Sequence, residues 1–328
     1  MTKALVTGVL GQDGSYLADL LVAKGYEVHG VTRRYSSPNL QNIQHLLATD
    51  AIHVHEADVT DGASLRAIMA TVKPDEVYLL AAQSHVGTSF SQPEATLDVT
   101  GLGALRALEA VRDVWPRARV YQASSSECFG NAPPRAPDGR LDEGDRFQPA
   151  SPYGAAKVMA HHLAHVYRHA YGLHVSCGLL FNHESPRRGV NFVTRKITRG
   201  LARIHHGLQD ALYLGNLDAV RDWGDARDYV EAMHTMLQQD QPDDYVIATG
   251  EGHTVREFLA VARALLDVPP DCVVVDASQR RPYDVDRLVG NPEKARARLG
   301  WKHVTGFSDL VASMVRHDRE LAAGERLG

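Results

Sequence analysis

The sequence predicts an α/β fold in which a doubly wound parallel sheet is followed by a smaller mixed lobe. The chain begins with a short apolar run, residues 4–6, that leads into glycines at spacing three, Gly8, Gly11 and Gly14. Apolar runs of strand length then alternate with helical segments through the first half of the chain, which is typical of parallel βαβ units. After Asn182 this alternation becomes irregular, which indicates a second unit built from shorter pieces. Together these observations favour a Rossmann-type sheet with a C-terminal substrate lobe.

The elements of the first unit follow in order along the chain. Strands are expected at the short apolar runs, residues 4–6, 27–31, 52–56, 76–82, 119–123 and 174–181. Helices are expected at the longer segments between them, residues 16–22, 62–72, 97–114 and 153–171. Residues 131–144 are rich in proline, glycine and charge, so they are expected to form a surface loop.

The second unit mixes short strands with helices. Its first helix, residues 192–206, is basic and amphipathic. Strands are then expected at 213–217, 245–248 and 273–276, and helices at 229–238, 255–266 and 310–321. We therefore divide the chain into a cofactor-binding domain, residues 1–182, and a substrate-binding lobe, residues 183–328. Whether part of this lobe crosses back to the sheet is left open.

The composition argues against several classes of protein. A net charge of −5 gives no reason to expect nucleic acid or an anionic membrane as a partner. No apolar run reaches the ~18 residues of a membrane span, and the N-terminus has no signal-peptide pattern. The three cysteines are widely spaced, which favours a reducing, cytoplasmic setting without disulfides. The 17 histidines lack ligand spacing, so no metal site is expected.

The glycine turn predicts a dinucleotide site. The first N–H groups of the helix that follows it are unpaired and attract anions, and glycines let a pyrophosphate approach the backbone closely. The spacing, G-x-x-G-x-x-G, differs from the G-x-G-x-x-G of most dehydrogenases. The second strand runs into Arg33 and Arg34 instead of the acidic residue typical of NAD sites, which favours NADP because guanidiniums suit a 2′-phosphate. Asp58 either accepts from the adenine amino group or caps the following helix.

A catalytic group is expected where the fifth strand meets the helix at 153–171. Tyr153 and Lys157 are four residues apart, so they share one helix face, and an ammonium there is expected to lower the pKa of the phenol. Ser124 to Ser126 and Glu127 follow the fifth strand, where a hydroxyl can bond a reacting oxygen. A carboxylate beside a redox site that already has a tyrosine base implies a second proton transfer. A dehydratase needs one, because it removes a proton from the carbon next to a ketone.

The motif Thr7-Gly8-x-x-Gly11-x-x-Gly14, the serine cluster and Tyr153-x-x-x-Lys157 resemble the extended short-chain dehydrogenase/reductase superfamily. More specific blocks across nearly the whole chain resemble the GDP-mannose 4,6-dehydratase family. These blocks are residues 11–17 (G-Q-D-G-S-Y-L), 82–86 (A-Q-S-H-V), 121–124 (Y-Q-A-S), 180–189 (L-F-N-H-E-S-P-R-R-G), 192–197 (F-V-T-R-K-I), 214–219 (L-G-N-L-D-A) and 221–224 (R-D-W-G).

The resemblance implies conversion of GDP-mannose to GDP-4-keto-6-deoxymannose with NADP retained in the site, by a homo-oligomer of two or four chains. Tyr153 would take the C4 hydroxyl proton, Ser125 would bond that oxygen, Lys157 would hold the nicotinamide ribose and Glu127 would carry out the proton transfers at C5 and C6. The motifs and the resemblance together indicate a set of cofactor residues: Gly8, Gly11, Gln12, Asp13, Gly14, Arg33, Arg34, Asp58, Val59, Ala82, Gln83, Ser84, Tyr153, Lys157, His183 and Arg188. The substrate residues that they indicate are Ser84, Ser126, Asn182, Lys196, Gly215, Asn216, Arg221, Arg281 and Asp284.

The chain departs from the family pattern at several positions. Ser125 and Ala150 replace a usual threonine and arginine, Asp284 replaces a glutamate, and Cys128 replaces a larger apolar residue, while residues 35–47 differ from the family's serine-rich loop. These departures keep two other hypotheses open. One is an enzyme of the same fold that acts on a different nucleotide sugar, as a dehydratase or a 4-epimerase. The other is a non-catalytic NADP-binding regulator.

Overall fold

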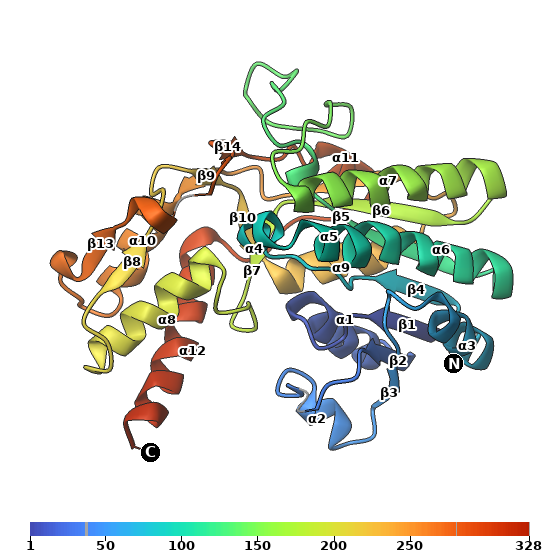
Figure 1. The fold of residues 1–328 in the computed structure, drawn as a ribbon, viewed down its shortest axis with the longest axis horizontal. Coiled ribbons are helices and arrows are strands. Elements are labelled where there is room, and N and C mark those ends of the chain that lie inside the picture. Colours follow the sequence, from blue (N-terminus) through green and yellow to red (C-terminus); the bar gives the residue numbers. More distant parts are fainter. Residues whose placement is uncertain (37–38, 280, 328) are drawn as a thin grey trace.

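The structure is a computed structural model that describes residues 1–36, 39–279 and 281–327. Its centre is a seven-stranded sheet with the order β11-β6-β5-β4-β1-β2-β3, in which every neighbouring pair is parallel. The doubly wound sheet expected from the sequence is therefore confirmed (Figure 1). Its strands are β1 (Lys3–Thr7), β2 (Glu27–Thr32), β3 (Ile52–Glu56), β4 (Glu76–Leu79), β5 (Arg119–Ser125), β6 (Val175–Leu180) and β11 (Asp244–Ile247).

Helices cover both faces of this sheet, which explains why its strands are apolar along most of their length. One face packs against α1 (Gln12–Ala23) and α9 (Ala226–Leu237), whose side chains share one core cluster. The opposite face packs against α3 (Gly62–Val72), α6 (Gly103–Val114) and α7 (Pro152–Tyr171). Figure 1 shows these helices in two layers around the strands.

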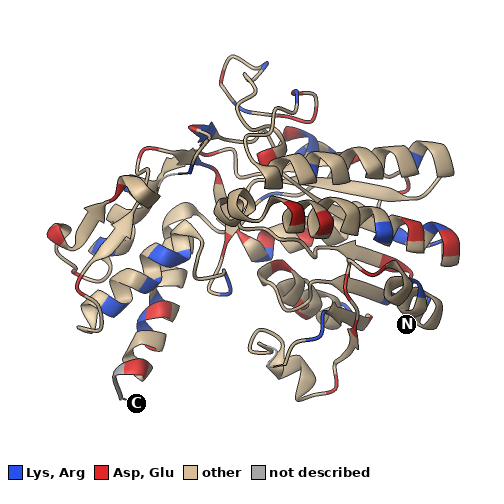
Figure 2. Ribbon diagram, viewed as in Figure 1, with Lys and Arg blue, Asp and Glu red and all other residues tan. Residues whose placement is uncertain are grey.

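A smaller lobe lies beside the carboxyl ends of the strands and has its own core. Its helices are α8 (Val193–His205), α10 (Val255–Ala264) and α12 (Phe307–Leu327). Short strands complete it: β8 (Leu212–Leu214), β13 (Val273–Val275), β9 (Val220–Arg221), β12 (His253–Thr254) and β14 (Arg287–Leu288). Figure 2 shows basic residues along α8, the helix that we expected to be basic and amphipathic.

The chain crosses back from this lobe to the main sheet. The strand expected at 245–248 is β11, which pairs with β6 at the edge of the sheet, and α11 (Glu293–Leu299) packs next to it. A second link joins β7 (Asn182–Glu184) to β10 (Trp223–Asp225) as a parallel pair. The division at residue 182 stays a prediction, and β11 and α9 belong spatially with the first unit.

Some local predictions differ from the structure. Helix α1 begins at Gln12, inside the glycine turn, rather than at residue 16. The helix expected at 97–114 consists of a π-helical turn, η1 (Leu97–Leu102), and α6, and it follows the short helices α4 (Val86–Ser91) and α5 (Pro93–Thr96). Proline can start a helix but cannot continue one, which explains the break at Pro93. Among the described residues, no helix combines the length and the apolar character that crossing a membrane requires.

Candidate active site

The glycine turn leads directly from β1 into α1. Gly8 has φ +72°, a conformation that side chains disfavour, and a Cβ on Gly14 would collide with the Gly8 carbonyl oxygen. Gly11 is the N-cap of α1 and has no side chain to accept from the first N–H groups of the helix. These groups therefore remain available to an anion, and the turn leaves room for a phosphate next to the backbone.

An ion pair between Asp13 and the buried His183 connects this turn to β7. His183 Nε2 lies 2.9 Å from Asp13 Oδ2, while the other ring nitrogen lies 2.7 Å from the Phe181 carbonyl oxygen. Burial would raise the pKa of Asp13, but the charge and hydrogen bond of His183 outweigh it and lower that pKa to about 2. Burial would likewise lower the pKa of His183, but Asp13 raises it above its ordinary value. Each group therefore favours the charged form of the other.

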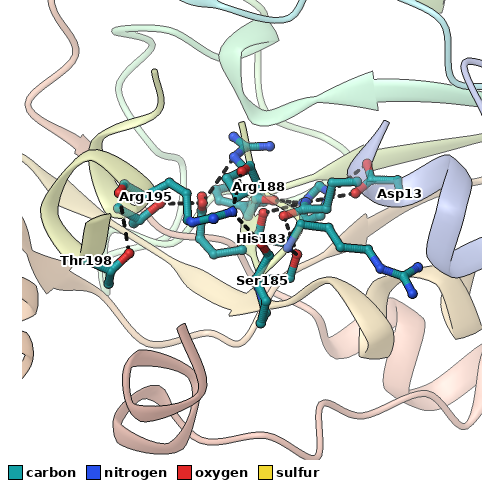
Figure 3. Close-up of polar contacts among 12 residues, drawn as sticks. Asp13, His183, Ser185, Arg188, Arg195 and Thr198 are labelled. Atoms are coloured by element: carbon teal, nitrogen blue, oxygen red, sulfur yellow. Dashed lines mark hydrogen bonds and ion pairs between the residues drawn. The ribbon is translucent and has the colours of Figure 1, made fainter. Parts of the chain in front are cut away.

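Polar contacts continue from this pair into the smaller lobe (Figure 3). Gln12 donates to the His183 carbonyl (3.0 Å) and accepts from the Ser185 hydroxyl (2.8 Å). Farther along, Arg195 on α8 donates to the carbonyls of Pro186 and Arg188. Residues 185–188 are thus held between α1 and α8.

Arg195 is itself fixed by α12. Its guanidinium donates to both oxygens of the Asp318 carboxylate at 2.7–3.0 Å, and the Thr198 hydroxyl donates to the same carboxylate at 2.6 Å. The loop that Arg195 holds places Arg188 at the cavity, where its guanidinium lies 3.6 Å from the centroid of the Phe192 ring. The motif at 180–189 pointed to Arg188, but the long-range role of Arg195 had no signal in the sequence.

The expected catalytic residues meet at the end of β5. Ser125 closes that strand and accepts from the Glu127 backbone N–H (3.2 Å) in the short turn that follows. Tyr153 and Lys157 come from the first turns of α7, whose N-cap Ser151 accepts from the Gly154 N–H. All four expected catalytic side chains belong to residues that are less than a tenth exposed.

The pKa of Tyr153 moves in the opposite direction from our expectation. Burial is the largest influence and raises it, although the Ser125 hydroxyl and Arg188 lower it. The Lys157 ammonium donates to the Ala123 carbonyl (2.6 Å) and lies 5.8 Å from the centre of the Tyr153 ring. The expectation of a lowered pKa for Tyr153 is therefore wrong for this structure. Burial also lowers the pKa of Lys157 itself, to about 8.

Charged side chains from the smaller lobe face Glu127. Arg281 Nη1 lies 3.8 Å from Glu127 Oε1 and 3.5 Å from Asp284 Oδ1. Arg221 is buried and lies 3.4 Å from the same Asp284 oxygen. Two guanidiniums therefore converge on a single pair of carboxylates. Each guanidinium has five N–H donors, more than these carboxylates take up, so donors remain for an anionic ligand such as a diphosphate.

One cavity of about 910 Å³ brings these groups together. All the expected site residues border it except Arg34, which is exposed, and the roles of the bordering residues remain predictions. Asn182 contributes a buried side-chain oxygen that has no hydrogen-bond partner within the described part of the chain, which suits a polar ligand. Lys196 donates to Gln279 (3.0 Å), and both residues border the cavity.

Two further residues refine the expectations. Asp58 Oδ1 accepts from the N–H (2.9 Å) and hydroxyl (2.8 Å) of Thr60, whereas Asp61 caps α3, so the capping role considered for Asp58 belongs to Asp61. His85, which the sequence did not single out, borders the cavity and packs edge-on against Phe192. It belongs to the block at 82–86, and that block was the only signal for it. Within residues 1–36, 39–279 and 281–327, no three His, Cys, Asp or Glu side chains are grouped so that they could hold a metal ion.

Comparisons with known proteins agree with this geometry. Residues 5–314 match the family model described as GDP-mannose 4,6 dehydratase. The chain is 53% identical to GDP-mannose 4,6 dehydratase 2 of Arabidopsis thaliana, over 99% of this chain and 88% of that protein. It is 46% identical to the Homo sapiens GDP-mannose 4,6 dehydratase, over 97% and 91%. Among solved structures, the Thermus thermophilus UDP-glucose 4-epimerase complex with NAD has a TM-score of 0.85 and 28% identity, covering 97% of this chain and 99% of that one.

Proposed function

Because the chain belongs to the GDP-mannose 4,6-dehydratase family, we propose that it converts GDP-mannose to GDP-4-keto-6-deoxymannose and water. The reaction is that of a hydro-lyase with an internal oxidation and reduction. The observation that carries the proposal is the presence of Glu127 in the same cavity as Tyr153 and Lys157. A tyrosine base alone serves an alcohol oxidation, whereas elimination of water also needs a group that takes the C5 proton.

The glycine turn and the available N–H groups of α1 fit the pyrophosphate of a nicotinamide dinucleotide. We propose NADP as the cofactor. Arg33 supports this choice, because it borders the cavity directly after β2, where an NAD site usually has a carboxylate. Its guanidinium stacks 4.7 Å from the Tyr35 ring centroid, an arrangement that leaves its edge available to a 2′-phosphate.

When bound at the glycine turn, the cofactor would supply the redox chemistry by taking up a hydride from C4 of the sugar that is later given back at C6. Tyr153 takes the proton of the C4 hydroxyl, and the Ser125 hydroxyl bonds the same oxygen. Since burial raises the pKa of Tyr153, the phenol needs a nearby positive charge to act as a base near neutral pH. The Lys157 ammonium lies 5.8 Å from the centre of the Tyr153 ring and is expected to hold the nicotinamide ribose.

The ketone at C4 makes the proton at C5 acidic. Glu127 takes that proton and returns it to the departing C6 hydroxyl, so that one water leaves. The proton that Tyr153 took from the C4 hydroxyl balances the proton that C5 takes up when the hydride reaches C6. Arg221 and Arg281 bind the diphosphate and hold the sugar in place between Glu127 and Tyr153.

We also propose a cytoplasmic homo-oligomer. Cys128, Cys177 and Cys272 are free and buried, as expected for a reducing compartment. Val166 and Tyr171 on α7 are about half exposed and are suited to an interface between subunits.

The test is product analysis of GDP-mannose incubated with the purified protein and a catalytic amount of NADP+. We expect the mass to fall by one water, with a ketone at C4 and a methyl group at C6 in the NMR spectrum. GDP-mannose that stays unchanged, with a protein that binds NADP, would refute the substrate assignment. A product of unchanged mass with an inverted C4 would indicate a 4-epimerase instead.

A further inference from the structure

A second polar cluster lies on the face of α7 that carries Tyr153 and Lys157. His161 follows Lys157 by one helical turn, and its Nδ1 lies 2.9 Å from the hydroxyl oxygen of Ser124 on β5. Both residues are buried, at 7% and 3% exposed. No step of the mechanism above uses His161.

The far side of the imidazole faces a carboxylate that is itself held in place. His161 Nε2 lies 3.6 Å from Asp244 Oδ2 at the start of β11. Arg168 donates to the other oxygen of Asp244 (2.5 Å) and to the Val175 carbonyl (2.7 Å), so the carboxylate has a fixed position. The edge of the Phe147 ring completes the enclosure, with 5.0 Å between ring centroids and 88° between planes.

These surroundings assign the hydrogen bond a direction. Burial lowers the pKa of His161 to about 4, and the opposing effect of Asp244 is smaller, so the imidazole is neutral near neutral pH. In a neutral imidazole one nitrogen carries the proton, and the Asp244 carboxylate favours the proton on Nε2. Nδ1 is then an acceptor, and the Ser124 hydroxyl donates to it.

The hydrogen bond between Ser124 and His161 is one of two that attach α7 to the end of β5. Lys157 donates to the carbonyl of Ala123, and His161, one turn later on α7, accepts from the next β5 residue, Ser124. Two consecutive turns of α7 are thus attached to two consecutive residues of β5. This arrangement fixes the rotation of the helix against the end of the strand, where Tyr153 and Ser125 must share one substrate oxygen.

We propose that His161 is a positioning residue for the dehydratase reaction, holding the Ser124 hydroxyl so that the end of β5 and the start of α7 keep Ser125 and Tyr153 aligned. This role rests on the proposed function and adds a residue that the motifs did not indicate. His161 lies outside the residues that border the cavity, so its effect must pass through Ser124, which does border it.

The test compares two substitutions that keep different atoms of the ring. Asparagine places an acceptor near the position of Nδ1, whereas glutamine places its amide near Nε2. We expect His161→Gln and Ser124→Ala to lower kcat for GDP-mannose by about one order of magnitude or more with little change in KM, since small misplacements of reacting groups are costly. His161→Asn is expected to retain most of the wild-type kcat. His165→Asn, an exposed histidine on the same helix, is the control and should leave kcat unchanged.

A second measurement checks the bond itself without substrate. The imidazole ¹⁵N spectrum is expected to show His161 as the neutral form with its proton on Nε2, and Ser124→Ala should shift its Nδ1 signal. Thermal unfolding of each variant separates a loss of alignment from a loss of fold.

Equal losses of kcat in His161→Asn and His161→Gln would overturn the proposal, as would full activity in His161→Gln. A loss confined to Ser124→Ala would assign Ser124 a direct contact with substrate and would also refute the role of His161. If the wild-type protein does not convert GDP-mannose, the proposed function fails and the positioning role in that reaction fails with it. An active wild type with unaffected His161 variants refutes the positioning role alone.

Discussion

The ion pair between Asp13 and His183 makes a quantitative prediction, because it joins the glycine turn to β7 across 170 residues of sequence. The perturbation is Asp13→Asn, which removes the charge and keeps the shape of the side chain. A pKa that falls from 3.8 to about 2 corresponds to roughly 2 kcal/mol of added stability for the ionised carboxylate, because one pKa unit is worth about 1.4 kcal/mol. We therefore expect Asp13→Asn to lower the free energy of unfolding by about 2 kcal/mol near neutral to mildly acidic pH.

The size of this effect should depend on pH in a defined direction. The folded pKa of Asp13 is lowered, so its contribution is fully present above its unfolded value of 3.8 and is lost as the pH falls through about 2. The folded pKa of His183 is raised, so its contribution is fully present below its unfolded value of 6.5 and is lost as the pH rises through the folded pKa. The pair stabilises most between these two unfolded values, and the penalty of Asp13→Asn should shrink at alkaline pH.

The assay is denaturant unfolding followed by tryptophan fluorescence, since Trp223 and Trp301 are buried and report on both lobes. Asp19→Asn on the same helix is the matched control. Asp19 lies 2.6 Å from His45 and 2.8 Å from Arg187, but all three side chains are partly exposed, so each pair is expected to contribute less than about 1 kcal/mol. The reasoning is refuted if Asp13→Asn costs no more than the control, or if its penalty is the same at about pH 6 and about pH 9.

Three further outcomes are expected. Glu127→Gln should lower kcat by roughly two orders of magnitude or more while NADP still binds, because the base that takes the C5 proton is lost. Reduced cofactor should then accumulate with GDP-mannose, and normal product formation would contradict the role assigned to Glu127. Activity should decline as the pH rises through about 8, where Lys157 loses its charge, and Lys157→Arg should move this decline to higher pH. If the decline in Lys157→Arg stays at the same pH, another group causes it. Arg33→Ala should weaken NADP binding by roughly tenfold or more and leave NAD binding nearly unchanged. Arg34→Ala, the control outside the cavity, should affect the binding of neither cofactor. Equal losses of affinity for both cofactors in Arg33→Ala would refute the 2′-phosphate contact.

The features that depend on spacing along the chain were predictable. The glycine turn, the four-residue interval between Tyr153 and Lys157 and the serine cluster before Glu127 each lie within one local segment. Their geometry follows from the repeat of a strand or a helix, so the sequence suffices to bring them to the same edge of a parallel sheet. The fold class was predictable for the same reason, because the alternation of apolar runs reports which segments are buried.

The features that depend on packing were not predictable. The return of β11 to the sheet, the choice of Arg33 over Arg34 at the cavity and the direction of the pKa shift of Tyr153 are consequences of what surrounds each group. A pKa depends on burial as much as on the nearest charge, and the burial of Tyr153 outweighs the effect that we expected from Lys157.

By itself, the sequence determined the order of the strands and main helices of the first unit, the glycine turn and the identity of the expected catalytic side chains. Only the tertiary structure decided which distant groups support them: His183 against Asp13, Arg195 behind the loop at 185–188, and His161 behind Ser124. The physical reason is that a motif records residues whose spacing is set by one local element. A supporting contact instead joins elements far apart in the chain, and its partners become neighbours only when the cores of both lobes have packed.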